Sequence, residues 1–121
     1  MAPHFFIETD VPLRLMRITL AGFFVAEDID RLAAARDQSL RAMGTAPNAH
    51  RTLVDIRDMD IQSQDSVHLF QQVLANPLTA SARLAFVVAR SLARMQLQRA
   101  AHSRDAHYFT TVEEAEAFLL A

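Results

Sequence analysis

Arg51-Thr-Leu-Val-Asp-Ile-Arg57 is a short apolar and β-branched run, and a second such run appears later in the chain as Leu84-Ala-Phe-Val-Val-Ala89. Both runs are shorter than a typical helix and carry apolar residues on both parities, which is typical of strands buried on both faces. Helical patterns lie between and around them. The two runs therefore predict a parallel or mixed sheet that is covered by helices.

The remaining segments fit this architecture. Residues 4–8 and 13–21 are predicted as the two strands of a hairpin, residues 25–43, 63–76 and 91–103 as helices, and residues 107–109 as a short last strand. Gly44 is expected to end the first helix, and Thr111 with Glu114 forms a capping box that opens a final helix. The predicted order is ββαβαβαβα, in a single α/β domain over residues 1–121.

The composition narrows the classes of function. The chain has 121 residues, of which 51% are hydrophobic, so it can bury one core. It contains no cysteine, no lysine and only two glycines, which excludes thiolate zinc sites, Schiff bases, P-loops and glycine-rich dinucleotide loops. No apolar stretch approaches the roughly 20 residues that cross a bilayer. We therefore expect a cytoplasmic protein without a cofactor or stable membrane insertion.

Three segments together resemble a known family. They are the Leu53-Val-Asp-Ile-Arg57 strand, the Gly22-Phe-Phe-Val-Ala-Glu-Asp28 stretch that leads into the first helix, and the closing stretch from Tyr108 to Leu120. They resemble the SpoIIAA-like group of STAS domains, also described as STAS/SEC14-like, and the resemblance spans nearly the whole chain. It implies a mixed sheet of four or five strands flanked by helices, used for binding and regulation without catalysis.

The resemblance does not extend to a phosphorylation motif. Anti-sigma factor antagonists of this group carry an Asp-Ser-Ser-Gly-like sequence where the loop after the third strand meets a helix. Residues 62–67 read Gln-Ser-Gln-Asp-Ser-Val here, so no phosphosite is carried over. The SEC14-like side of the resemblance, which implies an apolar ligand beside the sheet, is therefore the comparable alternative.

The loop after the Arg51 strand combines acids with serines at the start of a predicted helix. Its candidate residues are Asp58, Asp60, Ser63 and Ser66. One interpretation is a partner-docking or modification surface, because a phosphate added there meets a favourable helix dipole. The other is that the serines cap the helix.

Positive charge gathers in the second half of the chain, where residues 66–104 hold five arginines and no acid. Arg90, Ser91 and Arg94 follow the Leu84 strand, where α/β folds tend to bind anions, so they are candidate anion-binding residues. Alternatively, the arginines pair with acids of the first and last helices. The net charge of −2 argues against nucleic acid as a partner.

Three further groups have candidate roles. Phe70, Phe86 and Met95 either line a ligand site between the sheet and the helices or are plain core. Asp55 lies within a buried strand and needs a partner such as Arg51, Arg57 or Arg83. His102, Asp105 and His107 lack the i,i+4 spacing of helical metal pairs, so no metal site is predicted.

The sequence favours a non-enzymatic regulatory module that acts through protein–protein interaction. The alternative is a carrier or sensor of a small apolar or anionic amphipathic ligand. An enzyme is a third class, for which no nucleophile or acid–base pair can be named. A homodimer is expected because Phe6, Leu13 and Leu15 of the hairpin would otherwise add to an exposed apolar patch.

Overall fold

Strand β3 (Arg51–Met59) lies at the centre of a five-stranded sheet in the computed structural model, which describes residues 2–46, 48–76, 80–89 and 106–121. The strands follow in sequence order across the sheet: β1 (His4–Asp10), β2 (Leu15–Gly22), β3, β4 (Arg83–Val87) and β5 (Ala106–Phe109). β1 is antiparallel to β2, and the later pairs are parallel. The predicted mixed sheet is confirmed, while the helix expected over residues 91–103 lies outside the described residues.

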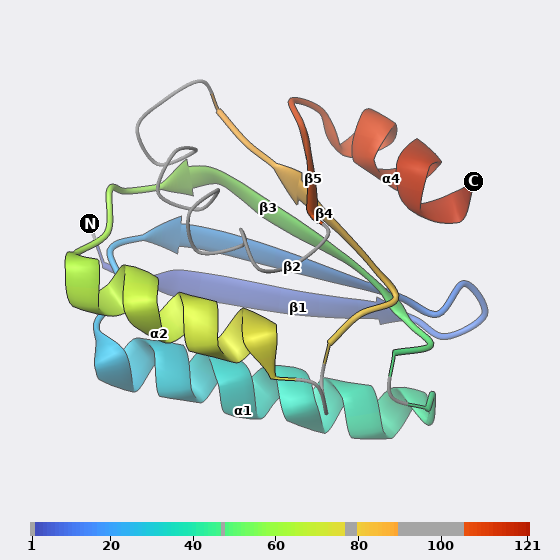
Figure 1. Ribbon diagram of the computed structural model, residues 1–121, viewed down its shortest axis with the longest axis horizontal. Coiled ribbons are helices and arrows are strands. Elements are labelled where there is room, and N and C mark those ends of the chain that lie inside the picture. Colours follow the sequence, from blue (N-terminus) through green and yellow to red (C-terminus); the bar gives the residue numbers. More distant parts are fainter. Residues whose placement is uncertain (1, 47, 77–79, 90–105) are drawn as a thin grey trace.

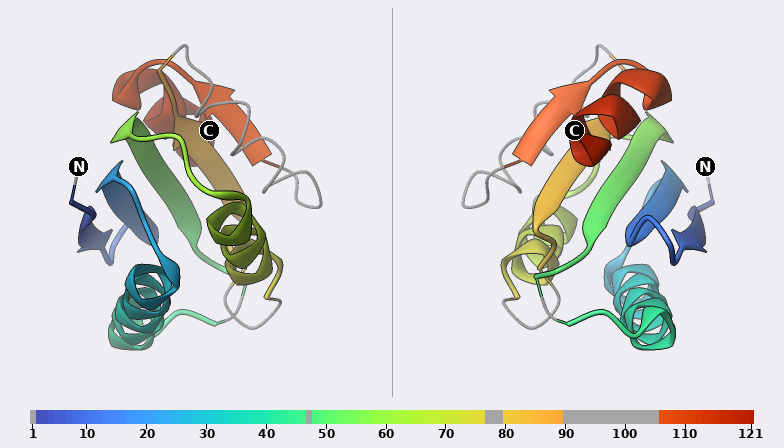
Figure 2. Two further views of the ribbon diagram at one scale, coloured as in Figure 1. Left: turned by 90° about the vertical axis from the view of Figure 1, so that its left-hand side faces the viewer. Right: turned by 90° about the vertical axis from the view of Figure 1, so that its right-hand side faces the viewer.

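Helices cover both faces of the sheet. α1 (Ala26–Met43) and α2 (Gln64–Ala75) lie on one side, and α4 (Val112–Leu120) lies on the other (Figure 1). The two side views in Figure 2 show the same three layers. Successive residues of a strand point to opposite faces, so Val54 of β3 packs toward α1 and α2 while Leu53 packs beneath α4. The chain thus has two apolar cores with the sheet between them.

The predicted hairpin is confirmed, but one of its residues is not where it was expected. A tight turn over residues 11–14 joins β1 to β2, with Arg14 in the left-handed region at φ 51°. Leu15 is fully buried with Leu53 and Leu119, so its predicted place in an exposed patch is wrong. Phe6 and Leu13, by contrast, remain 56% and 39% exposed. Leu15 is buried and Phe6 and Leu13 are not, because α4 packs mainly on β3, β4 and β5 and reaches β2 near Leu15.

Strand β3 is longer than the sequence pattern predicts. The sequence pattern predicts that Asp58 and Asp60 lie in a loop after the strand, yet the strand continues to Met59 and includes Asp58. An irregularity in the β2 ladder shifts the pairing, so that Ala21 lies beside Asp58 and Gly22 beside Met59. Backbone pairing therefore extends the strand past the point where its side chains become polar.

The helix ends agree with the predicted capping residues. Gly44 adopts the left-handed conformation at φ 70° after α1, and its N–H donates to the carbonyl of Arg41. At the start of α4, the Thr111 hydroxyl accepts the N–H of Glu114 at 3.2 Å and donates to the Glu114 carboxylate at 2.9 Å. These local contacts fix where α1 ends and where α4 begins to cover the second core.

We expect the Thr111→Ala substitution to lower the free energy of unfolding by about 1 kcal/mol, because it leaves the first turn of α4 without its cap. Thr110→Ala is the matched control, since the Thr110 hydroxyl makes only a 3.4 Å contact with Glu114. Urea unfolding followed by circular dichroism measures both variants. Equal urea midpoints for the two variants would contradict the capping role.

Candidate functional site

The β2–α1 connection and the β3–α2 connection meet at the edge of the sheet where β2 and β3 end. The side chain of Gln62 joins the two connections. Its Oε1 accepts the N–H of Phe24 at 2.8 Å, and its Nε2 donates to the carbonyls of Gly22 at 3.0 Å and Asp60 at 2.5 Å. Asp60 also donates its N–H to the Gly22 carbonyl at 3.0 Å. Gln62 is 5% exposed, so these bonds replace water that the backbone groups would otherwise need.

Ser66 strengthens the same junction from α2. It is 3% exposed, and its hydroxyl donates to the carbonyl of Phe24 at 2.6 Å. The Phe24 side chain is fully buried and packs edge-on against Phe70, with ring centroids 5.8 Å apart. Of the two serines proposed from sequence as modification sites, Ser66 is thus buried and engaged in the fold.

Ser63 is the exposed serine of the pair and caps α2. Its Oγ accepts the N–H of Ser66 at 3.1 Å, as the capping interpretation requires. Asp58 is exposed and Asp60 is partly exposed on the same connection. Three of the four proposed loop residues are therefore accessible from solvent.

The joined connections also expose apolar side chains that the sequence analysis did not single out. Phe23, Val25 and Ile61 are 37%, 51% and 51% exposed. They lie on both sides of the Gln62 bridge, because Gly22 and Phe24 flank Phe23 while Asp60 and Gln62 flank Ile61. Glu27 and Asp65 add exposed carboxylates in the first turns of α1 and α2. The result is a rigid edge that displays apolar groups among acids, and we call Phe23, Val25, Ile61, Asp58 and Asp60 the docking edge.

Asp55 pairs with Arg57 on the α4 side of the sheet, and Arg57 also interacts electrostatically with Asp58 of the docking edge. Arg57 donates from Nη2 to Asp55 Oδ2 at 2.7 Å and from Nε to Oδ1 at 3.0 Å. The hydrogen bonds with Asp55 raise the pKa of Arg57 above its ordinary value. Arg51 and Arg83, the other predicted partners, instead donate to the carbonyls of Leu13 and Phe118. The carboxylate of Asp55 is therefore held in an ion pair.

A second buried polar group lies at the opposite edge of the sheet, where β3 and β4 begin. His50 is 1% exposed, and its Nε2 lies 3.2 Å from the hydroxyl of Ser81, which in turn lies 2.5 Å from the hydroxyl of Thr52. The N–H of Ala82 donates to the His50 carbonyl at 2.7 Å. This chain of contacts fastens the segment before β4 to β3.

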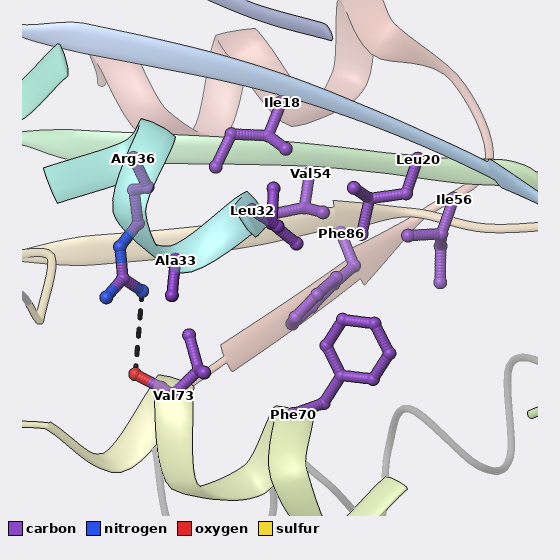
Figure 3. Close-up of a pocket in the computed structure, with 10 residues that line it drawn as sticks. All are labelled: Ile18, Leu20, Leu32, Ala33, Arg36, Val54, Ile56, Phe70, Val73 and Phe86. Carbon is purple, nitrogen blue, oxygen red and sulfur yellow. Dashed lines mark hydrogen bonds between the residues drawn. The ribbon is translucent and has the colours of Figure 1, made fainter. Parts of the chain in front are cut away.

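An apolar cavity of about 50 Å³ lies between the sheet and helices α1 and α2 (Figure 3). Its lining residues are Ile18, Leu20, Leu32, Ala33, Arg36, Val54, Ile56, Phe70, Val73 and Phe86. Phe70 and Phe86 both line this cavity and both belong to the buried core, so the ligand-site and core interpretations both stay predictions. Met95, the third residue of that hypothesis, lies outside the described residues.

Among the lining residues that the structure describes, Arg36 is the charged one, and it was not a candidate from the sequence. Its guanidinium donates to the carbonyl of Val73 at 3.5 Å and to the carboxylate of Asp37 at 3.2 Å. Figure 3 shows it at one end of the cavity, reaching from α1 to α2, with Phe70 and Ile56 farther along. A signal was present, because Arg36 is four residues after Leu32 and four before Leu40 and so falls on the apolar stripe of α1.

The other predicted sites have mixed outcomes. Arg90, Ser91 and Arg94, the proposed anion-binding residues, lie outside the described residues, as do His102 and Asp105. His107 lies on β5 with its ring 4.3 Å from that of Phe118. Within the described residues, no group of three or more histidines and acids is placed to hold a metal ion. No helix in the described part of the chain is both long and apolar enough to span a membrane.

Comparison with solved structures identifies the fold. An uncharacterized protein of the DUF3478 family with a SpoIIAA-like fold, from Shewanella loihica PV-4, superimposes with a TM-score of 0.71 at 16% identity and covers 97% of this chain and 93% of its own. The fold of this chain is SpoIIAA-like. An anti-sigma factor antagonist from Mycobacterium paratuberculosis matches with a TM-score of 0.64 at 9% identity, over 98% of this chain and 94% of its own.

The SpoIIAA-like fold accounts for the arrangement but does not identify a function. No protein-family model matches the sequence, and no curated protein matches it either. At these identities the similarity concerns the path of the backbone, and unrelated functions share such folds. The residues of the docking edge and of the cavity must therefore be judged by their own chemistry.

We expect the Gln62→Ala substitution to lower the free energy of unfolding by about 3 kcal/mol, because the buried N–H of Phe24 loses its acceptor and two carbonyls lose a donor. Gln64→Ala, at the exposed first residue of α2, is the control. Chemical unfolding measures both, and amide hydrogen exchange at Phe24 reports the local effect. A loss no larger than that of Gln64→Ala would contradict the bridging role of Gln62.

Proposed function

We propose that this protein is a non-enzymatic regulatory module that binds another protein at the docking edge. The observation that carries the proposal is the combination of three exposed apolar side chains with a backbone that Gln62 and Ser66 hold rigid. A rigid surface loses little conformational entropy on binding, so more of the contact energy is available for affinity. Large apolar anchors at the centre of a patch commonly supply most of that energy.

The charge around the apolar group indicates the kind of partner. Asp58 and Asp60 belong to the docking edge, and Glu27 and Asp65 lie in the adjoining helix turns. Acids at the rim of an interface favour a partner with basic groups, since complementary potentials increase the rate of encounter. The expected partner surface is therefore a hydrophobic patch or helix that carries arginine or lysine at its margin.

Ser63 is the position within this surface where modification would act most directly. It is exposed, and its side chain already occupies the N-terminal cap of α2. A phosphate there would interact favourably with the helix N-terminus but would add negative charge beside Asp65 and Asp60. Because the fold tolerates the group while the surface potential changes, phosphorylation of Ser63 would alter partner binding rather than stability.

We expect Phe23→Glu and Ile61→Glu each to abolish capture of the partner, because either change places a further carboxylate at the centre of the apolar group. Leu120→Glu is the control, since Leu120 is 42% exposed but lies on α4, on the other side of the sheet from α1 and α2. The measurement is affinity capture from the source organism, with mass spectrometry and circular dichroism of each variant. Retained capture by both folded edge variants would refute the proposal.

We further propose a homodimer in which a second copy covers Phe6 and Leu13. α4 leaves this part of the sheet face open, so Phe6 on the edge strand β1 and Leu13 in the following turn expose apolar surface that a second copy could cover. Phe6→Glu is then expected to give a monomer in light scattering coupled to size exclusion, whereas Phe23→Glu stays dimeric. A monomeric parent protein across a wide concentration range would reject the dimer.

A further inference from the structure

We propose that two copies of this chain pair through the outer edge of β1, antiparallel about a twofold axis at Phe6, so that their two sheets become continuous. The outer edge of β1 is the row of peptide groups of Phe5, Ile7 and Thr9 that points away from β2. The inference rests on the homodimer proposed above and adds the geometry of its interface. It does not depend on the docking edge, because no residue of the docking edge lies on β1.

β1 is an edge strand without the usual protection against pairing. It is the first strand in the order of the sheet, and in both views of Figure 2 no other strand or helix of the described residues lies beyond it. Its 7 residues pair with β2 in one unbroken register, so no bulge distorts the strand, and it contains no proline, lysine or arginine. Edges of natural sheets commonly carry such features, and a long, regular, apolar edge tends to pair with another strand.

The hydrogen bonds at the two ends of β2 show which of its residues face β3. The carbonyl of Arg14, just before β2, accepts the N–H of Arg51 at 2.8 Å. The carbonyl of Gly22, at the end of β2, accepts the N–H of Asp60 at 3.0 Å. Both acceptors have even numbers, and peptide groups alternate in direction along a strand. The odd-numbered residues of β2 therefore direct their peptide groups toward β1.

The pairing of β1 with β2 then fixes which peptide groups of β1 face outward. The odd-numbered residues of β2 lie opposite even-numbered residues of β1, as Thr19 lies opposite Phe6. In an antiparallel pair, residues that lie opposite each other either exchange both hydrogen bonds or exchange none. The peptide groups of Phe5, Ile7 and Thr9 therefore point away from β2 and are available to a further strand.

The side chains of β1 are divided between the two faces of the sheet. Phe5 and Ile7 are partly buried against the core beneath α1 and α2. His4, Phe6 and Glu8 point to the other face, where all three are exposed. A further strand fits this edge best if it is apolar on the helix side and carries a histidine and a carboxylate around an aromatic residue on the open face. A second copy of β1 has that pattern.

An axis at Phe6 gives complementary pairs on both faces. On the open face Phe6 meets Phe6 of the partner subunit, and His4 lies opposite Glu8 of the partner subunit. On the helix side Phe5 lies opposite Ile7 of the partner subunit. Aromatic pairs and complementary polar pairs across two antiparallel strands are stabilising, whereas like charges directly opposite each other are destabilising. An axis at Ile7 would instead place Phe6 against a carboxylate, and an axis at Glu8 would bring two carboxylates together.

The same register pairs the outward peptide groups. Phe5 and Ile7 of the partner subunit exchange N–H···O=C hydrogen bonds in both directions, and the Thr9 N–H donates to the carbonyl of Pro3 of the partner subunit. Pro3 has no N–H, so no donor is lost at that position. The twofold symmetry makes each of these contacts occur twice. Leu13, in the turn after β1, lies at the margin of this interface.

The first test uses disulfide formation, since the chain contains no cysteine of its own. Positions 4 and 8 form a non-hydrogen-bonded pair across the axis, with Cα atoms about 4.5 Å apart, a distance that a disulfide can span. We expect mild oxidation to convert the His4→Cys/Glu8→Cys double variant into a covalent dimer while Phe6 stays in place. Each single variant is the control, because its two thiols would lie about 13 Å apart along the strands. A mixture of the two single variants should again cross-link.

The second test removes one donor at the outer edge of β1. Thr9→Pro deletes an N–H that points away from β2, so it leaves the β1–β2 pairing intact but costs the interface a hydrogen bond in each copy. We expect the dimer dissociation constant to rise on the order of tenfold. Thr9→Ala retains the N–H and should change the constant by less than about twofold. Analytical ultracentrifugation measures dissociation, and circular dichroism confirms that each variant is folded.

Amide hydrogen exchange of the parent protein gives a third readout. The amides of Phe5, Ile7 and Thr9 should exchange more slowly in the dimer than after dilution to the monomer. The amide of Phe6 faces β2 and should be protected in both states. Equal exchange of the three outward amides in dimer and monomer would contradict the pairing.

Failure of the pairing and failure of the homodimer give different results. A parent protein that is monomeric at every concentration would remove both. A dimeric parent whose His4→Cys/Glu8→Cys variant does not cross-link, or whose Thr9→Pro variant dissociates no more than Thr9→Ala, would overturn the β1 pairing and leave a dimer through another surface. None of these variants alters the docking edge, so partner capture is tested separately.

Discussion

Strand β3 must be covered on both faces, and the rest of the fold follows from that constraint. Leu53 faces one side of the sheet and is 2% exposed, while Val54 and Ile56 face the other and are 7% and 2% exposed. One layer of helices would leave the side chains of one face in water, at a cost of about 25 cal/mol for each Å² of apolar surface. α1 and α2 therefore cover one face and α4 covers the other, with a separate apolar core beneath each.

This layered arrangement separates the two candidate sites. The docking edge lies where β2 and β3 end and the chain turns into α1 and α2, and the Gln62 side chain fixes it from within. The cavity lies deeper, between those helices and the sheet, with Arg36 at its rim. Both sites involve α2, since Ser66 anchors its first turn and Phe70 lines the cavity.

The SpoIIAA-like fold is shared with an anti-sigma factor antagonist at 9% identity, so the side chains of this chain must be considered by themselves. After β3 the chain has one exposed cap, Ser63, and in the first turn of α2 one buried serine, Ser66, whose hydroxyl donates to the β2–α1 connection. The same hydroxyl cannot be both a structural donor in the core and a freely accessible modification site. A shared backbone therefore leaves the regulatory chemistry to be decided by individual side chains.

The sequence by itself determined the elements whose signals are local. Within the described residues, hydrophobic periodicity located the strands and helices, and the caps at Gly44, Ser63 and Thr111 followed from side-chain type. The sequence also indicated that Asp55 needs an arginine partner, and the structure selects Arg57 among three candidates. Only the tertiary structure decided the burial of Leu15, the bridge made by Gln62 and the place of Arg36 at a cavity. Alternation along a strand shows that a residue faces one side of the sheet, but which side is covered depends on a helix distant in sequence. The burial of Leu15, the Gln62 bridge and the position of Arg36 arise from contacts between segments that are distant in sequence. The local pattern of residues therefore does not predict them.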